Sequence, residues 1–266
     1  MKLSHIALAT SAVLFSAAST AHVNIENSCD VNLNGNMQYK DEVLTINTDS
    51  GKSITFNAGH QVFVNGKQLN LSSEEQAHAK AYYGAVQQAV PLAIDIAIDG
   101  LEIASEAMGE VFTELLGEDD SLVQDLDYLF ADIRTQLDNK FFDADGGFVL
   151  DGSDIQYNGW AGNAWENQFE ERVESLVAKA VGKLMISLGS QMLMGGDESE
   201  GTLARLENLD TTIEEKVELR AEALEFKAKD LCNIMQDADA AENALKYSHE
   251  ELTELDIIKF SRENAE

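Results

Sequence analysis

The spacing of apolar residues in this chain changes at Ser72, and that change divides the expected fold into two parts. Before Ser72, β-forming residues occupy short stretches at 43–46, 53–56 and 61–64, separated by turn-forming residues, as in half-buried strands. After Ser72 the apolar residues recur with a period near 3.6, the repeat of an amphipathic α-helix. The chain therefore predicts an α+β fold, with a small N-terminal antiparallel β-meander followed by a mainly helical, elongated bundle.

Two local sequence signals predict a hairpin in the β part and the start of the helical part. Asn65-Gly66 lies between the β-rich stretches 61–64 and 68–71, and this dipeptide predicts a tight hairpin. Ser72 is followed three residues later by Glu75, the spacing of a capping box, which predicts that a helix begins here.

The helical part divides at proline, glycine and acidic breaks. Pro91, the only proline of the chain, is expected to kink or end the first helix. Residues 142–163 form an irregular insert rich in Gly and Asp, in which 148–150 and 155–157 could pair as a short hairpin. The periodicity predicts helices over 72–90, 92–116, 121–141, 164–194 and 202–247, with a short final helix at 250–262. The helix predicted over 92–116 carries acidic residues at helical spacing, which predict one solvent-exposed face: Asp95, Asp99, Glu102, Glu106, Glu110 and Glu114.

The first 21 residues have the composition of a secretory signal peptide. Lys2 supplies a positive charge, residues 6–18 are apolar and uncharged, and the small residues Ser19 and Ala21 precede the expected cut. We therefore expect a Sec-type signal cleaved after Ala21 and a periplasmic protein. The predicted organisation is a signal peptide at 1–21, a small β subdomain at 22–71 and a helical body at 72–266.

The charge of the chain limits its partners. With 48 acidic and 18 basic residues the formal net charge is −30, which argues against nucleic acid and anionic membrane surfaces. No later segment has the composition of a membrane span, because the longest apolar run, at 89–107, contains four carboxylates. Cations or basic proteins are the partners that this charge favours, but a heavily solvated acidic surface is the preferred explanation.

Cys29 and Cys232 are the only cysteines. An even count in an oxidising compartment predicts a disulfide, which would connect the start of the mature chain to a late helix. The residues before Cys29 lack the apolar and small pattern of a lipid-modified cysteine, so we expect no lipid anchor.

The sequence contains no recognisable catalytic set, and we assign no catalytic residues. It has no Gly-x-Ser-x-Gly, no Cys-x-x-Cys and no glycine-rich phosphate loop after a strand. A glycosidase needs only two facing carboxylates, and 48 acidic residues leave that chemistry open. The sequence favours a non-enzymatic protein, with an enzyme acting on cell-wall glycan as the alternative.

A partial calcium-loop pattern lies in the insert. Acidic side chains stand at loop positions one, three, nine and twelve, but Gly147 and Phe148 occupy positions five and six, where a calcium loop needs a ligand and a glycine. The alternatives are therefore a cation site and an acidic β-turn, and the candidate ligands are Asp143, Asp145, Asp151 and Asp154.

Several short stretches together resemble the YggN-like family of bacterial periplasmic proteins, whose domain has no known function. The matching stretches are 29–31, 62–67 leading into 69–75, 114–118 and 169–174, with Cys232 late in the chain. The resemblance covers nearly all of the mature chain. It implies a periplasmic location and supports the pairing of the two cysteines, and it implies no activity.

Our leading functional hypothesis is an envelope protein that binds other proteins or peptides, in a chaperone-like way. Long amphipathic helices can hold apolar segments of a partner, although a closed helical bundle explains the same stripes. Self-association through the helices and calcium binding are further alternatives. The expected contact residues follow one stripe of the last long helix: Leu203, Leu206, Ile213, Val217 and Leu224.

Overall fold

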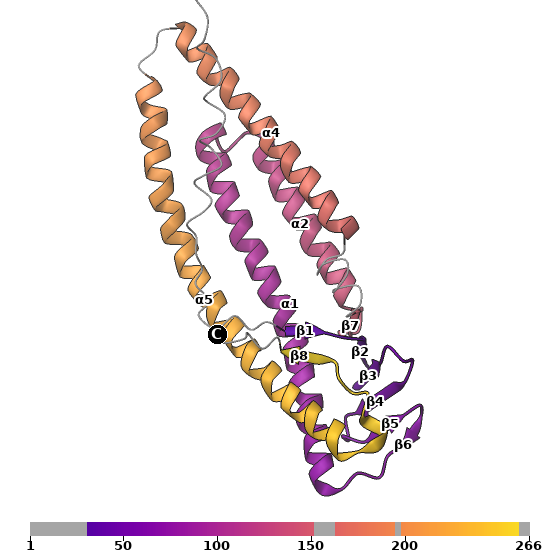
Figure 1. Ribbon diagram of the computed structural model, residues 1–266. Helices are drawn as coiled ribbons and strands as arrows, with labels where there is room; N and C mark the ends of the chain where they lie inside the picture. Colours follow the sequence, from indigo (N-terminus) through magenta and orange to yellow (C-terminus); the bar gives the residue numbers. More distant parts are fainter. Residues whose placement is uncertain (1–30, 152–162, 195–197, 261–266) are drawn as a thin grey trace, which may run out of the picture.

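The protein consists of long helices that share one long axis, with a small β-sheet packed near one end (Figure 1). The computed structural model describes residues 31–151, 163–194 and 198–260, with side chains for 31–151, 169–186 and 217–260. The long helices are α1 (Ser73–Leu116), α2 (Ser121–Phe141), α4 (Asn163–Met194) and α5 (Glu198–Ser248). The predicted α+β fold is confirmed.

The larger sheet has the strand order β6-β5-β4-β3-β2-β7, and each described pairing is antiparallel. Five strands that follow one another in the chain form the predicted meander: β2 (Asn36–Lys40), β3 (Val43–Asn47), β4 (Ser53–Asn57), β5 (Val62–Val64) and β6 (Lys67–Gln68). Strand β7 (Phe148–Asp151) comes from the insert and pairs with β2. The stretch 155–157, which the sequence offered as its partner, lies outside the described residues.

The predicted hairpin at Asn65-Gly66 is confirmed. Both residues have positive φ, 49° and 78°, as a two-residue turn with the twist of the flanking strands requires. The β2–β3 connection uses the same backbone shape at Asp41 and Glu42, which also have positive φ. Neither of these two residues is a glycine or asparagine, so sequence signals did not single out this turn.

The last described residues form a strand where the sequence predicted a helix over 250–262. After a single 3-10 turn, η2 (Glu250–Leu252), the chain extends into β8 (Ile258–Phe260), which pairs antiparallel with β1 (Val31–Leu33). The physical reason is tertiary, because Leu252, Leu255 and Ile257 are all buried against the body of the protein.

Helix α1 is continuous from Ser73 to Leu116, so the prediction that Pro91 ends a helix is wrong. Proline removes the N–H that would bond the carbonyl of Gln87. Both Pro91 and Gln87 are exposed, so water can solvate that carbonyl, while the adjacent buried Val90 and Ile94 hold the helix to its neighbours.

The start of α1 is the predicted capping box. Glu75 N donates to Ser72 Oγ at 3.2 Å, and Ser72 N donates to Glu75 Oε2 at 2.7 Å. These bonds satisfy two backbone donors at the helix start and hold the pKa of Glu75 below its usual value.

The core begins between the sheet and the first half of α1. Phe56 and Tyr82 lie with ring centroids 5.3 Å apart, and both residues are fully buried. Further along its length α1 packs against α5, which runs beside it in the opposite direction (Figure 1). Helix α4 packs against both α2 and α1, and its residues Leu176 and Ala180 are buried.

Candidate functional site

The predicted contact stripe on α5 lies partly inside the bundle. Leu203, Leu206 and Ile213 belong to α5, but their side chains lie outside the described residues. Val217 and Leu224 are half-buried. A β-carbon at Gly100 of α1 would lie 3.9 Å from Leu224 Cδ2, so this leucine packs against the neighbouring helix.

A different row of apolar side chains faces solvent on α4. Val177, Val181 and Met185 follow one another at intervals of four residues, the spacing that places side chains on one helix face. Their exposed fractions are 38%, 36% and 68%. We call these three residues the α4 stripe. The face that α4 buries, with Leu176 and Ala180, lies beside it.

Carboxylates extend the same face of α4 toward its N-terminus. Glu170 precedes Val177 by seven residues, and Glu174 precedes Val181 by seven, which places them on the face of the α4 stripe. Both glutamates are exposed. The face therefore changes along its length from anionic to apolar.

Helix α5 carries a smaller exposed group with the same chemistry. Leu219 and Phe226 are seven residues apart and are 68% and 71% exposed. Glu222 and Asp230 are exposed near them on the same side of the helix. Leu219 and Phe226 lie on the opposite side of α5 from the half-buried Leu224, so the stripe predicted from the sequence did not include them.

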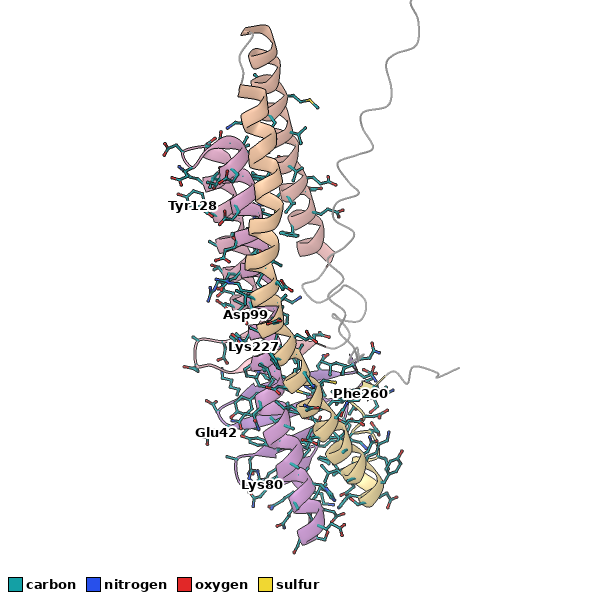
Figure 2. All side chains as sticks on the ribbon, turned by 90° about the vertical axis from the view of Figure 1, so that its left-hand side faces the viewer. Glu42, Lys80, Asp99, Tyr128, Lys227 and Phe260 are labelled. Carbon is teal, nitrogen blue, oxygen red and sulfur yellow. The ribbon has the colours of Figure 1, made fainter. Side chains whose placement is uncertain are left out.

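Basic side chains join helices α1 and α5 across their contact. Lys227 Nζ donates to Asp95 Oδ2 and Asp99 Oδ2, each at 2.6 Å, and Figure 2 shows Lys227 beside Asp99 between the two helices. The two carboxylates raise the pKa of Lys227 well above its usual value. Arg220 donates to Glu106 at 2.9 Å. Part of the predicted solvent-exposed face of α1 therefore pairs with cations of α5.

The helices α2 and α4 are joined in the same way. Lys183 Nζ lies 2.6 Å from Asp120 Oδ1, and Arg172 donates to Asp132 at 2.6 Å. Lys183 and the amide of Leu122 lower the pKa of Asp120, which is also the N-cap of α2. Because these cations are used within the molecule, the carboxylates outside the pairs dominate the outer charge.

The acidic insert forms a turn stabilised by its own backbone. Asp143 Oδ1 accepts hydrogen bonds from Gly147 N at 2.7 Å and Asp145 N at 3.0 Å, and these bonds lower the pKa of Asp143. Asp151 ends β7, opposite Asn36 of β2, and Asp154 lies outside the described residues. Within the described part of the chain, no group of three acidic, histidine or cysteine side chains is placed to hold a metal. Calcium binding at Asp143–Asp154 stays a prediction.

Glu242 of α5 is the one fully buried charged side chain among the described residues, with 1% of its surface exposed. Its Oε1 accepts hydrogen bonds from Ile257 N at 2.7 Å and Ile258 N at 3.1 Å. Burial raises the pKa of Glu242 to about 7, against the opposing effect of these bonds and of the Tyr82 hydroxyl. No feature of the sequence distinguished this glutamate from the others.

Cys232 is half-buried on α5, and Gln236 Nε2 lies 3.6 Å from its sulfur. Cys29 lies outside the described residues, so the disulfide between them stays a prediction. The pairing of β1 with β8 does bring the start of the described chain to its end.

None of the helices in the described part of the chain is both long and apolar enough to cross a bilayer. The residues of the expected signal peptide lie outside that part.

Comparison with known proteins places nearly the whole chain in one family. Residues 29–258 match the family described as "Protein of unknown function (DUF2884)". The chain is similar to the uncharacterized protein YggN of Escherichia coli strain K12, with 21% identity over 239 residues, which cover 88% of this chain and 95% of the relative. The YggN proteins of E. coli O6:H1 and O157:H7 match to the same extent. No solved structure matches the chain. The chain therefore belongs to this YggN-containing family of proteins of unknown function, as its sequence motifs predicted.

Proposed function

We propose that this protein is a non-enzymatic periplasmic binder of other proteins or peptides, with a chaperone-like preference for cationic segments that carry apolar side chains. The α4 stripe is the observation that supports this proposal. Single exposed apolar residues are ordinary, but a continuous row of them on one helix face is typical of an interaction surface. The periplasmic part rests on the signal-like residues 1–21.

Charge determines which partner this surface fits best. Glu170 and Glu174 share the face of the α4 stripe, and the whole chain has a net charge of −30. An amphipathic segment with lysine or arginine could bury its apolar side chains on Val181 and Met185 while its cations meet the glutamates. A second copy of this chain would bring like charges together, so self-association is less favourable.

The glycan-cleaving alternative needs an accessible pair of carboxylates. Glu242 has the raised pKa of a general acid, but its carboxyl is 1% exposed and already accepts two backbone amides. The negative charge of Asp256 also raises the pKa of Glu242, but Asp256 is paired with Lys246 at 2.8 Å and with Lys259 at 3.2 Å. Nothing in this arrangement favours the enzymatic reading over the binder.

Binding of a synthetic peptide tests the proposal directly. We expect a fluorescent peptide of alternating lysine and leucine to raise its anisotropy with the purified mature protein, and an alternating glutamate and leucine peptide to bind far more weakly. The binding is expected to weaken with added salt because exposed charges are screened. Equal binding of both peptides would contradict the preference for cationic segments, and no binding of either would contradict the binder itself.

Two neighbouring positions on α4 provide a matched pair of variants. Met185 and Ile186 are both large and exposed, at 68% and 75%, but only Met185 belongs to the α4 stripe. Met185→Glu is expected to weaken peptide binding by about tenfold, because it removes an apolar contact from the interface. Ile186→Glu adds the same charge on another face and is expected to change binding by less than about twofold. Equal effects of the two variants would exclude the α4 stripe as the contact surface.

A further inference from the structure

The end of the described chain is attached to the helices through one buried carboxyl group. Residues 257 and 258, which lead into β8, donate their amides to Glu242 Oε1 at 2.7 and 3.1 Å. Strand β8 in turn pairs with β1, and Asn34 N donates to Ile257 O at 2.8 Å. Glu242 therefore fastens both the first and the last described strands to α5.

The second oxygen of Glu242 is buried beside a hydroxyl of helix α1. Glu242 Oε2 and Tyr82 Oη are both buried, and neither has a partner of normal hydrogen-bond geometry. The hydroxyl still acts on the carboxyl and favours its ionised form, so the two groups are neighbours. Tyr82 belongs to α1 and is fully buried.

The charged groups near Glu242 come from three parts of the fold. Tyr82 faces it from α1, Lys246 from α5, and Asp256 from the segment before β8. Lys246 and Asp256 form an ion pair of 2.8 Å, and Lys259 of β8 lies 3.2 Å from the other oxygen of Asp256. The nearby cations are thus paired with Asp256, which leaves Glu242 with backbone amides and one hydroxyl.

We propose that the buried carboxyl of Glu242 is a proton-dependent latch that fastens β8, and through it β1, to helix α5. With the proton bound, Glu242 is neutral and its Oε1 keeps the two backbone amides in a buried site that holds no charge. When the proton leaves to solvent, a negative charge remains in an apolar site beside Asp256, and the latch weakens. This device is independent of the α4 stripe and of the proposed binding function.

The direction of the effect follows from the two states of the chain. Folding raises the pKa of Glu242 from 4.5 to about 7. Between these values the folded protein holds a proton that the unfolded chain has lost, so rising pH favours opening. The latch is therefore fully closed at pH values below 4.5 and loosens as the pH rises through about 7.

Hydrogen exchange at the latch amides measures this opening. Protection factors for the Ile257 and Ile258 amides, measured by NMR on the purified protein, are expected to fall on the order of 100-fold between about pH 5 and about pH 8. Glu242→Gln keeps the acceptor oxygen and is neutral at every pH, so its protection is expected to stay constant over that range. Glu225→Gln, at an exposed site of the same helix, is the matched control and is expected to behave as the wild type. A pH dependence in Glu242→Gln equal to that of the wild type would overturn the proposal.

A second measurement does not depend on the folding of the Gln variant. The carboxyl ¹³C signal of Glu242 in the wild-type protein is expected to titrate with a midpoint about 7, and a midpoint at the ordinary 4.5 would overturn the proposal. Tyr82→Phe removes the hydroxyl that favours the ionised form, so its midpoint is expected to move upward. An unchanged or lower midpoint would contradict the contact between the Tyr82 hydroxyl and the Glu242 carboxyl.

Discussion

Gly147 shows how one residue without a side chain can fix the place of a strand. A β-carbon there would lie 2.5 Å from Tyr39 O and 2.8 Å from Asp143 Oδ2, closer than real contacts allow. Its amide also donates to Asp143. The acidic residues that suggested a calcium loop thus form, at Asp143, a turn that brings β7 onto the sheet.

Gly147→Ala is therefore expected to destabilise the protein by about 2 kcal/mol, because the backbone of β2 or of the turn must move. Gly109 of α1 provides the control, since a β-carbon there would meet nothing within 4 Å. Gly109→Ala is expected to raise the unfolding free energy by up to about 1 kcal/mol through its helix propensity. Urea denaturation measures both. A neutral Gly147→Ala would mean that the close approach at this turn relaxes without cost.

The sequence also could not show which apolar residues of α5 are buried and which are exposed for binding. Leu224 and Phe226 both look like apolar residues of an amphipathic helix, but Leu224 packs toward Gly100 of α1 and Phe226 is 71% exposed. Arg220 and Lys227 interrupt the apolar pattern of α5 because they meet carboxylates of α1. If these two basic residues had been matched with the acidic row on α1, they would have indicated which face of α5 is buried.

At the scale of whole elements, the structure follows two local signals of the sequence closely. The capping box at Ser72 and the hairpin at Asn65-Gly66 each depend on residues close together in the chain, and both were predicted. Strand β8 has only three residues, and its partner β1 lies more than 200 residues earlier. No local pattern encodes that pairing, because burial against distant elements decides it.

Helix α1 can be used to test how a long helix tolerates an interior proline. Pro91→Ala restores an N–H for the carbonyl of Gln87 at an exposed position, and we expect it to stabilise the protein by about 1 kcal/mol. This is less than the cost of an interior proline, since the proline also restricts the unfolded chain. Lys80→Ala, at another exposed site of α1, is the control and should change stability by less than about 0.5 kcal/mol. Thermal and urea denaturation measure the change, and a loss of stability would mean that the restriction of the unfolded chain by Pro91 outweighs the missing hydrogen bond.

On the scale of the whole molecule, two electrostatic effects oppose each other. Pairs such as Lys227 with Asp95 and Asp99 hold the helices together, but they lie at partly exposed positions. Exposed pairs contribute little, because water screens them and their side chains lose entropy. Against them stands the repulsion among 48 acidic side chains that only 18 basic ones offset. The repulsion is distributed over the whole chain, so we expect it to be the larger effect.

Salt should therefore stabilise this protein. Raising NaCl from about 10 mM to about 500 mM shortens the screening length from roughly 30 Å to a few ångström, which suppresses the long-range repulsion more than the close pairs. We expect the melting temperature at neutral pH to rise by about 5 °C, as followed by circular dichroism. Lys227→Met removes a cation and its pairs, so its melting temperature should increase more steeply with salt than that of the wild type. A fall in melting temperature with salt would show instead that the interhelix pairs dominate, and the acidic surface would then cost the fold little.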